Sequence, residues 1–123
     1  MKIRLIHSIC ISILAVACLY TGYRLALAYV IEHNKAFAYS WINKVKEAEN
    51  AYYEKYGKYG NLIDLSSVGL LEKEWTQASK RPYKFEVVVT EKGYEASVVP
   101  IDTDSPYIPY FLDESGIIKR DAK

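Results

Sequence analysis

An uncharged apolar run near the start of the chain constrains the fold more than any other feature. Residues 5–23 contain no Asp, Glu, Lys or Arg, and through residue 31 the run is interrupted only by His7 and Arg24. A helix rises about 1.5 Å per residue, so about twenty residues cross a hydrocarbon core of about 30 Å. Residues 1–31 are therefore predicted to form a transmembrane anchor, and residues 32–123 a soluble domain.

The charges that flank the apolar run predict its orientation. Lys2 and Arg4 precede it, whereas Arg24, Glu32 and Lys35 at the other end are of mixed sign. Positive residues favour the cytoplasmic side of a membrane. We therefore expect a single-pass protein of the inner (cytoplasmic) membrane, with its N-terminus inside and its C-terminal domain in the periplasm or outside the cell.

Two cleaved forms compete with the uncleaved anchor. A basic start, a short apolar stretch and Ala15-Val16-Ala17 are also typical of a secretory signal peptide, which would be cut after Ala17. Cys18 directly after this site is similar to the lipidated cysteine of bacterial lipoproteins. The chain stays apolar over residues 19–31, which favours the uncleaved anchor. All three forms imply export of the C-terminal domain.

Charge and cysteine content exclude several classes of protein. Sixteen Lys and Arg are balanced by fifteen Asp and Glu, so the basic excess of a nucleic-acid binder is missing. Cys10 and Cys18 both lie in the apolar run, which leaves the soluble domain without a disulfide framework or a metal-binding Cys/His spacing. We expect both cysteines to act as small hydrophobic residues.

The helix is predicted to continue to residue 56. Residues 32–56 contain no Gly or Pro, and Gly57 follows as a plausible C-terminal cap. Apolar residues recur in steps of three and four, which defines one helical face: Ala36, Phe37, Trp41, Val45, Ala48, Tyr52 and Tyr56. The opposite face is expected to hold the polar residues Lys44, Lys46, Glu47, Glu49, Asn50 and Glu54.

The remainder of the chain predicts a small antiparallel sheet. Asn61 is a candidate N-cap for a helical turn at residues 62–65, and Gly69 permits a turn within 66–71. Strands are expected at residues 83–89, 94–99, 110–112 and 117–119, with turns at 91–93 and 113–116 and a loop at 102–109. The fold class is therefore α+β: a long N-terminal helix packed against three or four antiparallel strands. Phe37, Trp41, Val45, Ala48 and Tyr52 are predicted to face this sheet.

A series of short motifs resembles type IV pilins and type II secretion pseudopilins. The motifs are Ala48-Glu49-Asn50-Ala51-Tyr52-Tyr53, Tyr56-Gly57-Lys58-Tyr59, Leu62 with Leu65, Gly69-Leu70-Leu71, Pro82-Tyr83-Lys84-Phe85, Gly93-Tyr94-Glu95-Ala96 and Phe111-Leu112-Asp113-Glu114-Ser115-Gly116. Their order and spacing cover residues 42–120. The resemblance implies a pilin-like fold on one long helix whose first half spans the membrane.

The chain departs from that family at its N-terminal end. Prepilins have a leader that ends in glycine, then Phe-Thr-Leu and a glutamate that helps to dock each subunit into the fibre. Here the first acidic residue is Glu32, and neither the glycine nor Phe-Thr-Leu is present. The resemblance therefore implies the fold, and does not extend to leader processing or to the usual route of polymerisation.

No residue pattern in the sequence predicts an enzyme. Catalytic, cofactor-binding and metal-binding residues are all expected to be absent, as is a small-molecule substrate. His7 and His33 are the only histidines, and His33 is expected to be a solvated helix residue. Asp102-Thr103-Asp104-Ser105, with Asp113, could supply oxygen ligands to calcium, but the glycine and glutamate of a calcium loop are missing and a plain polar turn is favoured.

The sequence therefore favours a non-enzymatic structural or interaction protein, a pilin-like or pseudopilin-like subunit of a cell-envelope assembly. Its expected partners are the lipid bilayer and other subunits that contact the N-terminal helix. The alternatives are a single-pass accessory subunit of another membrane complex, and a periplasmic protein or lipoprotein with a signal peptide.

Overall fold

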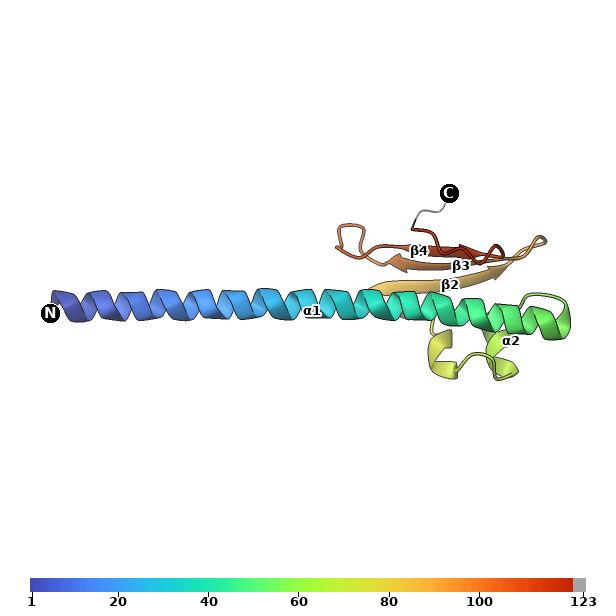
Figure 1. The fold of residues 1–123 in the computed structure, drawn as a ribbon, viewed down its shortest axis with the longest axis horizontal. Helices are drawn as coiled ribbons and strands as arrows, with labels where there is room; N and C mark the ends of the chain where they lie inside the picture. The colour runs from blue at the N-terminus through green and yellow to red at the C-terminus, as the bar shows by residue number, and fades with distance from the viewer. Residues whose placement is uncertain (121–123) are drawn as a thin grey trace. The chain divides into compact units, whose positions relative to one another are not determined.

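The structure is a computed structural model that describes residues 1–120. Residues 121–123, the end of the expected 32–123 domain, lie outside the described residues. The helices and strands follow one another as α1 Lys2–Tyr56, α2 Leu62–Ser67, the short 3-10 helix η1 Lys73–Thr76, β1 Ser79–Lys80, β2 Tyr83–Val89, β3 Tyr94–Pro100 and β4 Tyr110–Asp113 (Figure 1).

The α+β class predicted from the sequence is confirmed. The 55-residue helix α1 is followed by four strands that form one antiparallel sheet in the order β1-β2-β3-β4. Internal contacts divide the chain into an N-terminal unit, Met1–His33, and a C-terminal unit, Asn34–Lys123, and α1 contributes residues to both.

One face of the sheet is buried because the strands alternate. In β2, Tyr83 and Phe85 are buried whereas Lys84 is exposed, and in β3 Val98 is buried between half-buried and exposed neighbours. The register of β2 and β3 brings Phe85 opposite Val98. Successive side chains of a strand point to opposite faces, so this pattern buries one face and leaves the other to solvent.

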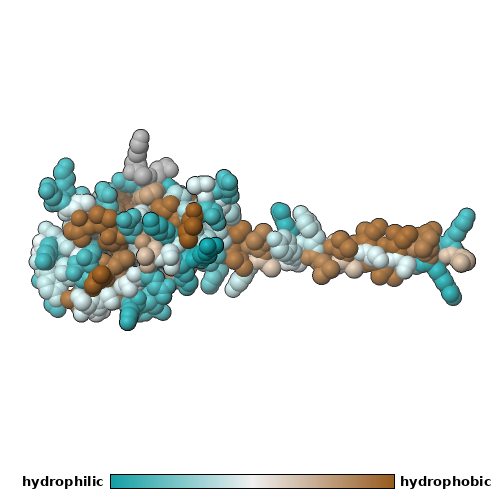
Figure 2. Space-filling view, turned by 180° about the vertical axis from the view of Figure 1, so that it is seen from behind, coloured by the Kyte–Doolittle hydropathy of each residue, from teal (hydrophilic) through white to brown (hydrophobic). Residues whose placement is uncertain are grey.

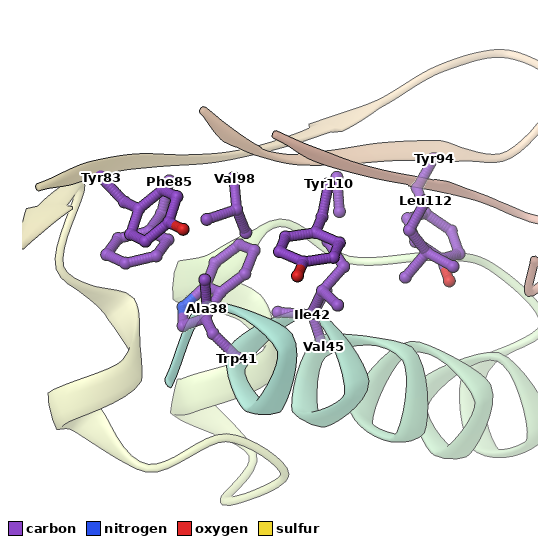
Figure 3. Packing of buried hydrophobic residues seen from close by; sticks show 11 residues of the cluster. Ala38, Trp41, Ile42, Val45, Tyr83, Phe85, Tyr94, Val98, Tyr110 and Leu112 are labelled. Carbon is purple, nitrogen blue, oxygen red and sulfur yellow. The ribbon is translucent and has the colours of Figure 1, made fainter. Parts of the chain in front are cut away.

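The buried face packs on the second half of α1 and forms the sheet core (Figure 3). Trp41 is central to it: the indole stacks on Phe85 with ring centroids 4.9 Å apart, and its Nε1 donates a hydrogen bond to the carbonyl oxygen of Trp75 at 2.8 Å. The sheet core consists of Ala38, Trp41, Ile42, Val45, Tyr83, Phe85, Tyr94, Ala96, Val98, Tyr110 and Leu112. The prediction that Trp41 and Val45 face the sheet is confirmed, and Phe37 packs half-buried at its margin.

The prediction was wrong for Ala48 and Tyr52. They lie in a second cluster, the α2 core, with Leu65 of α2 and Leu71. The reason is that α1 buries two neighbouring rows of side chains and not a single stripe, since residues seven and eleven apart lie above one another on a helix. Ala38, Ile42 and Val45 form one row, which faces the sheet. The adjacent row begins at Trp41, which also belongs to the sheet core, and continues to Ala48 and Tyr52, which belong to the α2 core.

The connection between α1 and α2 follows the sequence prediction closely. Gly57 has a φ of +70° and its N–H donates to the carbonyl oxygen of Tyr53, as expected for a helix C-cap. Asn61 caps α2: its Oδ1 accepts from the N–H of Asp64 at 2.9 Å, while Oδ2 of Asp64 accepts from the N–H of Asn61 at 3.0 Å. This reciprocal pair is a capping box, which fixes where α2 begins.

Two strands differ from the sequence prediction. Residues 117–119 do not form a strand, because after the turn at Gly116 (φ +74°) only Lys119 comes into register, in a single bridge to Phe111. Conversely, the sequence pattern does not predict β1. This strand has only two residues, Ser79 and Lys80, which pair with Lys84 and Tyr83, and two residues are too few to show an alternation of apolar and polar side chains.

Candidate functional site

The N-terminal unit is an apolar helical surface with no covering element. None of the side chains of residues 1–33 is buried, and α1 contains a stretch long and apolar enough to cross a membrane. Figure 2 shows hydrophobic residues along most of this segment, broken by a hydrophilic band. The largest exposed apolar residues include Ile3, Leu5, Ile6, Ile11, Ile13, Leu14, Val16, Leu19 and Leu25. A surface of this kind is stable in contact with lipid or with another apolar helix.

Three polar side chains within the apolar stretch bond to the backbone of the same helix. The hydroxyls of Ser12 and Thr21 each donate to the carbonyl oxygen four residues earlier, at 2.9 Å in both cases. His7 Nδ1 lies 2.6 Å from the carbonyl oxygen of Ile3. In hydrocarbon an unpaired polar group is costly, so these internal bonds make the segment compatible with a bilayer interior. Cys10 and Cys18 are free and exposed on its surface.

The residues considered as possible calcium ligands lie in two separate turns. The N–H of Ser105 donates to the carbonyl oxygen of Asp102, which closes the first turn. Asp113 lies in the second, where it accepts hydrogen bonds from the Ser115 hydroxyl and from the Ser115 N–H, and pairs with Lys119 at 3.4 Å. These bonds, led by the one from the Ser115 side chain, hold the pKa of Asp113 below its usual value. Among residues 1–120 no group of three His, Cys, Asp or Glu is arranged to hold a metal.

The aromatic residues of the C-terminal unit form packing pairs. Tyr39 contacts Tyr110 edge-on, and Tyr53 stacks on Tyr59, which in turn contacts Tyr94 at 4.9 Å between ring centroids. His33, which is exposed, stacks on Tyr29 within the N-terminal unit. Such contacts each contribute about 0.5–1.5 kcal/mol beyond the burial of area. Their role is therefore to hold the loop 57–61 and the strands against α1.

Glu49 lies in a different place from the one that its charge predicts. It was expected on the polar face of the helix, but its side chain is 0% exposed. It follows Ala38, Ile42 and Val45 in steps of four, three and four, which places it on the row that faces the sheet. The spacing alone predicts a buried position for Glu49, because the three preceding members of this row are apolar.

Only one of the two carboxyl oxygens of Glu49 is satisfied. Oε2 accepts a hydrogen bond from the N–H of Gly60 at 3.0 Å, and Oε1 has no partner among the described residues. Burial raises the pKa of Glu49 from 4.5 to about 7, with a smaller contribution from the negative charge of Asp64, while the bond from Gly60 acts in the opposite direction. A protonated Glu49 is therefore stable at a pH where an exposed glutamate is ionised.

The exposed face of the sheet has a hollow of about 250 Å³. It arises beside the small side chain of Ser97, which lies opposite Glu86 on one side and Phe111 on the other. Glu95, Asp113 and Lys119 complete its polar lining. Since Lys119 already pairs with Asp113, part of the charge around the hollow is neutralised within the chain.

Comparison with protein-family models, with curated proteins and with solved structures found no match. The architecture itself, an apolar N-terminal helix followed by a four-stranded antiparallel sheet, is pilin-like.

Proposed function

We propose that this chain is a non-enzymatic, membrane-anchored subunit of a cell-envelope assembly, of the pilin-like or pseudopilin-like kind found in type IV pili and type II secretion systems. The proposal rests on the difference in burial between the two parts of α1. Residues 1–33 offer an apolar surface with no buried side chain, and the residues after Asn34 are the helical support of a folded α+β unit. Such a helix anchors the chain and leaves a folded unit free to contact other subunits.

Lys2 and Arg4 favour a cytoplasmic N-terminus. We therefore expect a C-terminal fusion to alkaline phosphatase, which matures only outside the cytoplasm, to be active in cells. A fusion at the same site to a reporter that works only in the cytoplasm should be inactive. The reverse pattern of the two reporters would contradict the proposed topology. Replacing Lys2 and Arg4 by Glu in both fusions tests whether these charges set the topology. The replacement should weaken the preference for a cytoplasmic N-terminus.

Self-association into a fibre made only of this chain is not expected. Residues 2–31 carry Lys2, Arg4 and Arg24 and no acidic residue, so bundling these helices would bring like charges together in a medium of low dielectric constant. Anionic lipid headgroups neutralise the same charges if the chain stays in the membrane. Shearing cells and probing the filament fraction should therefore recover little of this protein. A filament composed mainly of it would show that the charges are neutralised in another way.

The second candidate is an accessory subunit of a different membrane complex. Residues 2–31 contain no acidic residue that could neutralise the positive charges of a neighbouring copy, which favours this candidate. Affinity purification from membranes separates the two, since a pilin-like subunit should co-purify with other pilin-like chains and an accessory subunit with unlike partners. Intact-mass measurement of the same sample distinguishes an uncleaved chain from one cut after Ala17 and from one lipidated at Cys18.

A further inference from the structure

The buried carboxyl of Glu49 lies where α1 meets the loop that leads to α2. Its neighbours on the helix, Ala48 and Tyr52, belong to the α2 core, while its own row faces the sheet. Within the described part of the chain, Glu49 accepts one hydrogen bond, from the N–H of Gly60 eleven residues later. This bond therefore joins the last turns of α1 to the loop 57–61.

The loop is closely packed at Gly60, and Gly57 at its start lies in open space with a positive φ. A Cβ on Gly60 would lie 3.0 Å from Asp64 Cβ and 3.1 Å from Tyr52 Cε1, closer than ordinary van der Waals contact. A Cβ on Gly57 would meet nothing within 4 Å, and its φ of +70° is a conformation that glycine adopts freely. Movement of the loop away from α1 can therefore occur by rotation at Gly57 while α1 stays intact.

The groups around Glu49 do not neutralise its negative charge. Asp64 on α2 is itself negative, and the nearby hydroxyls of Tyr59 in the loop and Tyr94 on β3 are uncharged over the pH range in which Glu49 ionises. Asp113, the last residue of β4, and Glu114 after it are also negative, and both raise the pKa of Tyr94. The nearby cation on α1, Lys46, has its side chain against Gly116. No ion pair of Glu49 is found within residues 1–120, and its Oε1 is unpartnered, so an ionised Glu49 has one hydrogen bond and no counter-charge.

We propose that Glu49 is a proton-operated latch for the loop 57–61. When the carboxyl is protonated, it stays buried and its Oε2 holds the N–H of Gly60, which keeps Tyr59 against Tyr94. When the proton is lost, the carboxylate is more stable in water than in this pocket, and the loop opens at Gly57 to hydrate it. The latch belongs to the C-terminal unit and does not depend on the proposed membrane assembly.

The direction of the pH dependence follows from the two states. In the closed state the pKa of Glu49 is raised to about 7, and in the open state it returns to its ordinary value of 4.5. The closed loop is thus fully favoured below pH 4.5 and loses stability as the pH rises towards 7. Above that pH both states are ionised and the preference no longer changes. Across this range of about 2.5 pH units the opening equilibrium should increase by about 300-fold, tenfold for each unit.

Amide hydrogen exchange of the full-length protein in detergent micelles tests the latch directly. The protection factor of the Gly60 amide, corrected for intrinsic exchange, should fall about 300-fold between pH 4 and pH 8 and level off near pH 7. The amide of Thr90, which bonds to Gly93 in the β2–β3 turn, serves as an internal control and should keep its protection. A Gly60 protection factor that does not change with pH would refute the proposal.

Glu49→Gln keeps the shape and the acceptor for Gly60 but cannot ionise. Its Gly60 protection should be independent of pH and equal to that of the wild type at pH 4. Asp64→Asn removes the facing negative charge, and should move the midpoint of the wild-type transition to lower pH. A carbon-13 NMR titration of the Glu49 carboxyl uses the wild-type protein, so its result does not depend on whether a variant folds. An apparent midpoint near 4.5, or a Glu49→Gln variant with the wild-type pH dependence, would also refute the latch.

Discussion

Replacing Trp41 by alanine is expected to lower the free energy of unfolding of the C-terminal unit by about 3–5 kcal/mol, the usual result of truncating a buried aromatic side chain. Trp41 is 1% exposed, stacks on Phe85 and donates its Nε1 hydrogen to Trp75. The substitution therefore removes a contact to the sheet and a bond to η1 together. Thermal or denaturant unfolding followed by near-ultraviolet circular dichroism measures the loss.

Two further variants separate these contributions. Trp41→Phe keeps an aromatic ring against Phe85 but leaves the carbonyl oxygen of Trp75 without its donor, so it should destabilise the unit less than Trp41→Ala. Lys44→Ala, an exposed substitution on the same helix, should change stability by less than about 0.5 kcal/mol. If Trp41→Ala resembled Lys44→Ala, the placement of the indole in the sheet core would be wrong.

Val98→Asp is expected to prevent folding of the C-terminal unit or to leave it only marginally stable. Val98 is 0% exposed in the middle of β3, and an aspartate there would be an unpaired buried charge. Such a charge costs about 3–5 kcal/mol or more, which is comparable with the total stability of a small domain. Loss of dispersed amide signals in an NMR spectrum, or rapid proteolysis of the unit, measures the outcome.

The neighbouring valine provides a matched control. Val99 pairs with Lys84 on the solvent face of the sheet and is 37% exposed. Val99→Asp makes the same chemical change one residue along the same strand, and should be tolerated because the carboxylate stays hydrated and lies opposite a lysine. Equal effects of the two substitutions would mean that the register of β2 and β3, which assigns these residues to opposite faces, is incorrect.

Elements with a strong local pattern could be predicted from the sequence. The absence of Gly and Pro from residues 32–56, followed by Gly57, indicated where α1 ends. The alternation around Phe85 and Val98 predicted the bounds of β2 and β3 to within one residue. Asn61 was identified as an N-cap because its side chain can replace the missing helical acceptor. In each case local chemistry and tertiary packing favour the same structure.

The candidate site depended on contacts between distant residues and was not predicted. The charge of Glu49 suggested a solvated position, whereas its spacing from Val45 and Ile42 placed it in the sheet-facing row, and the spacing proved decisive. Its bond to Gly60 has no counterpart in any sequence motif. Likewise, nothing near Ala48 or Tyr52 indicates that α2 covers them, because that depends on where the chain returns after Gly57.

The two clusters on α1 differ in how much chain must be ordered before they can form. The α2 core joins Ala48 and Tyr52 to Leu65 and Leu71, which follow within a short loop. The sheet core joins Trp41 and its neighbours to strands near the C-terminus, so a much longer loop must close first. Closing a loop costs more entropy as its length grows, and non-local contacts slow folding. The α2 core can therefore form before the sheet core, whose less local contacts are expected to close last.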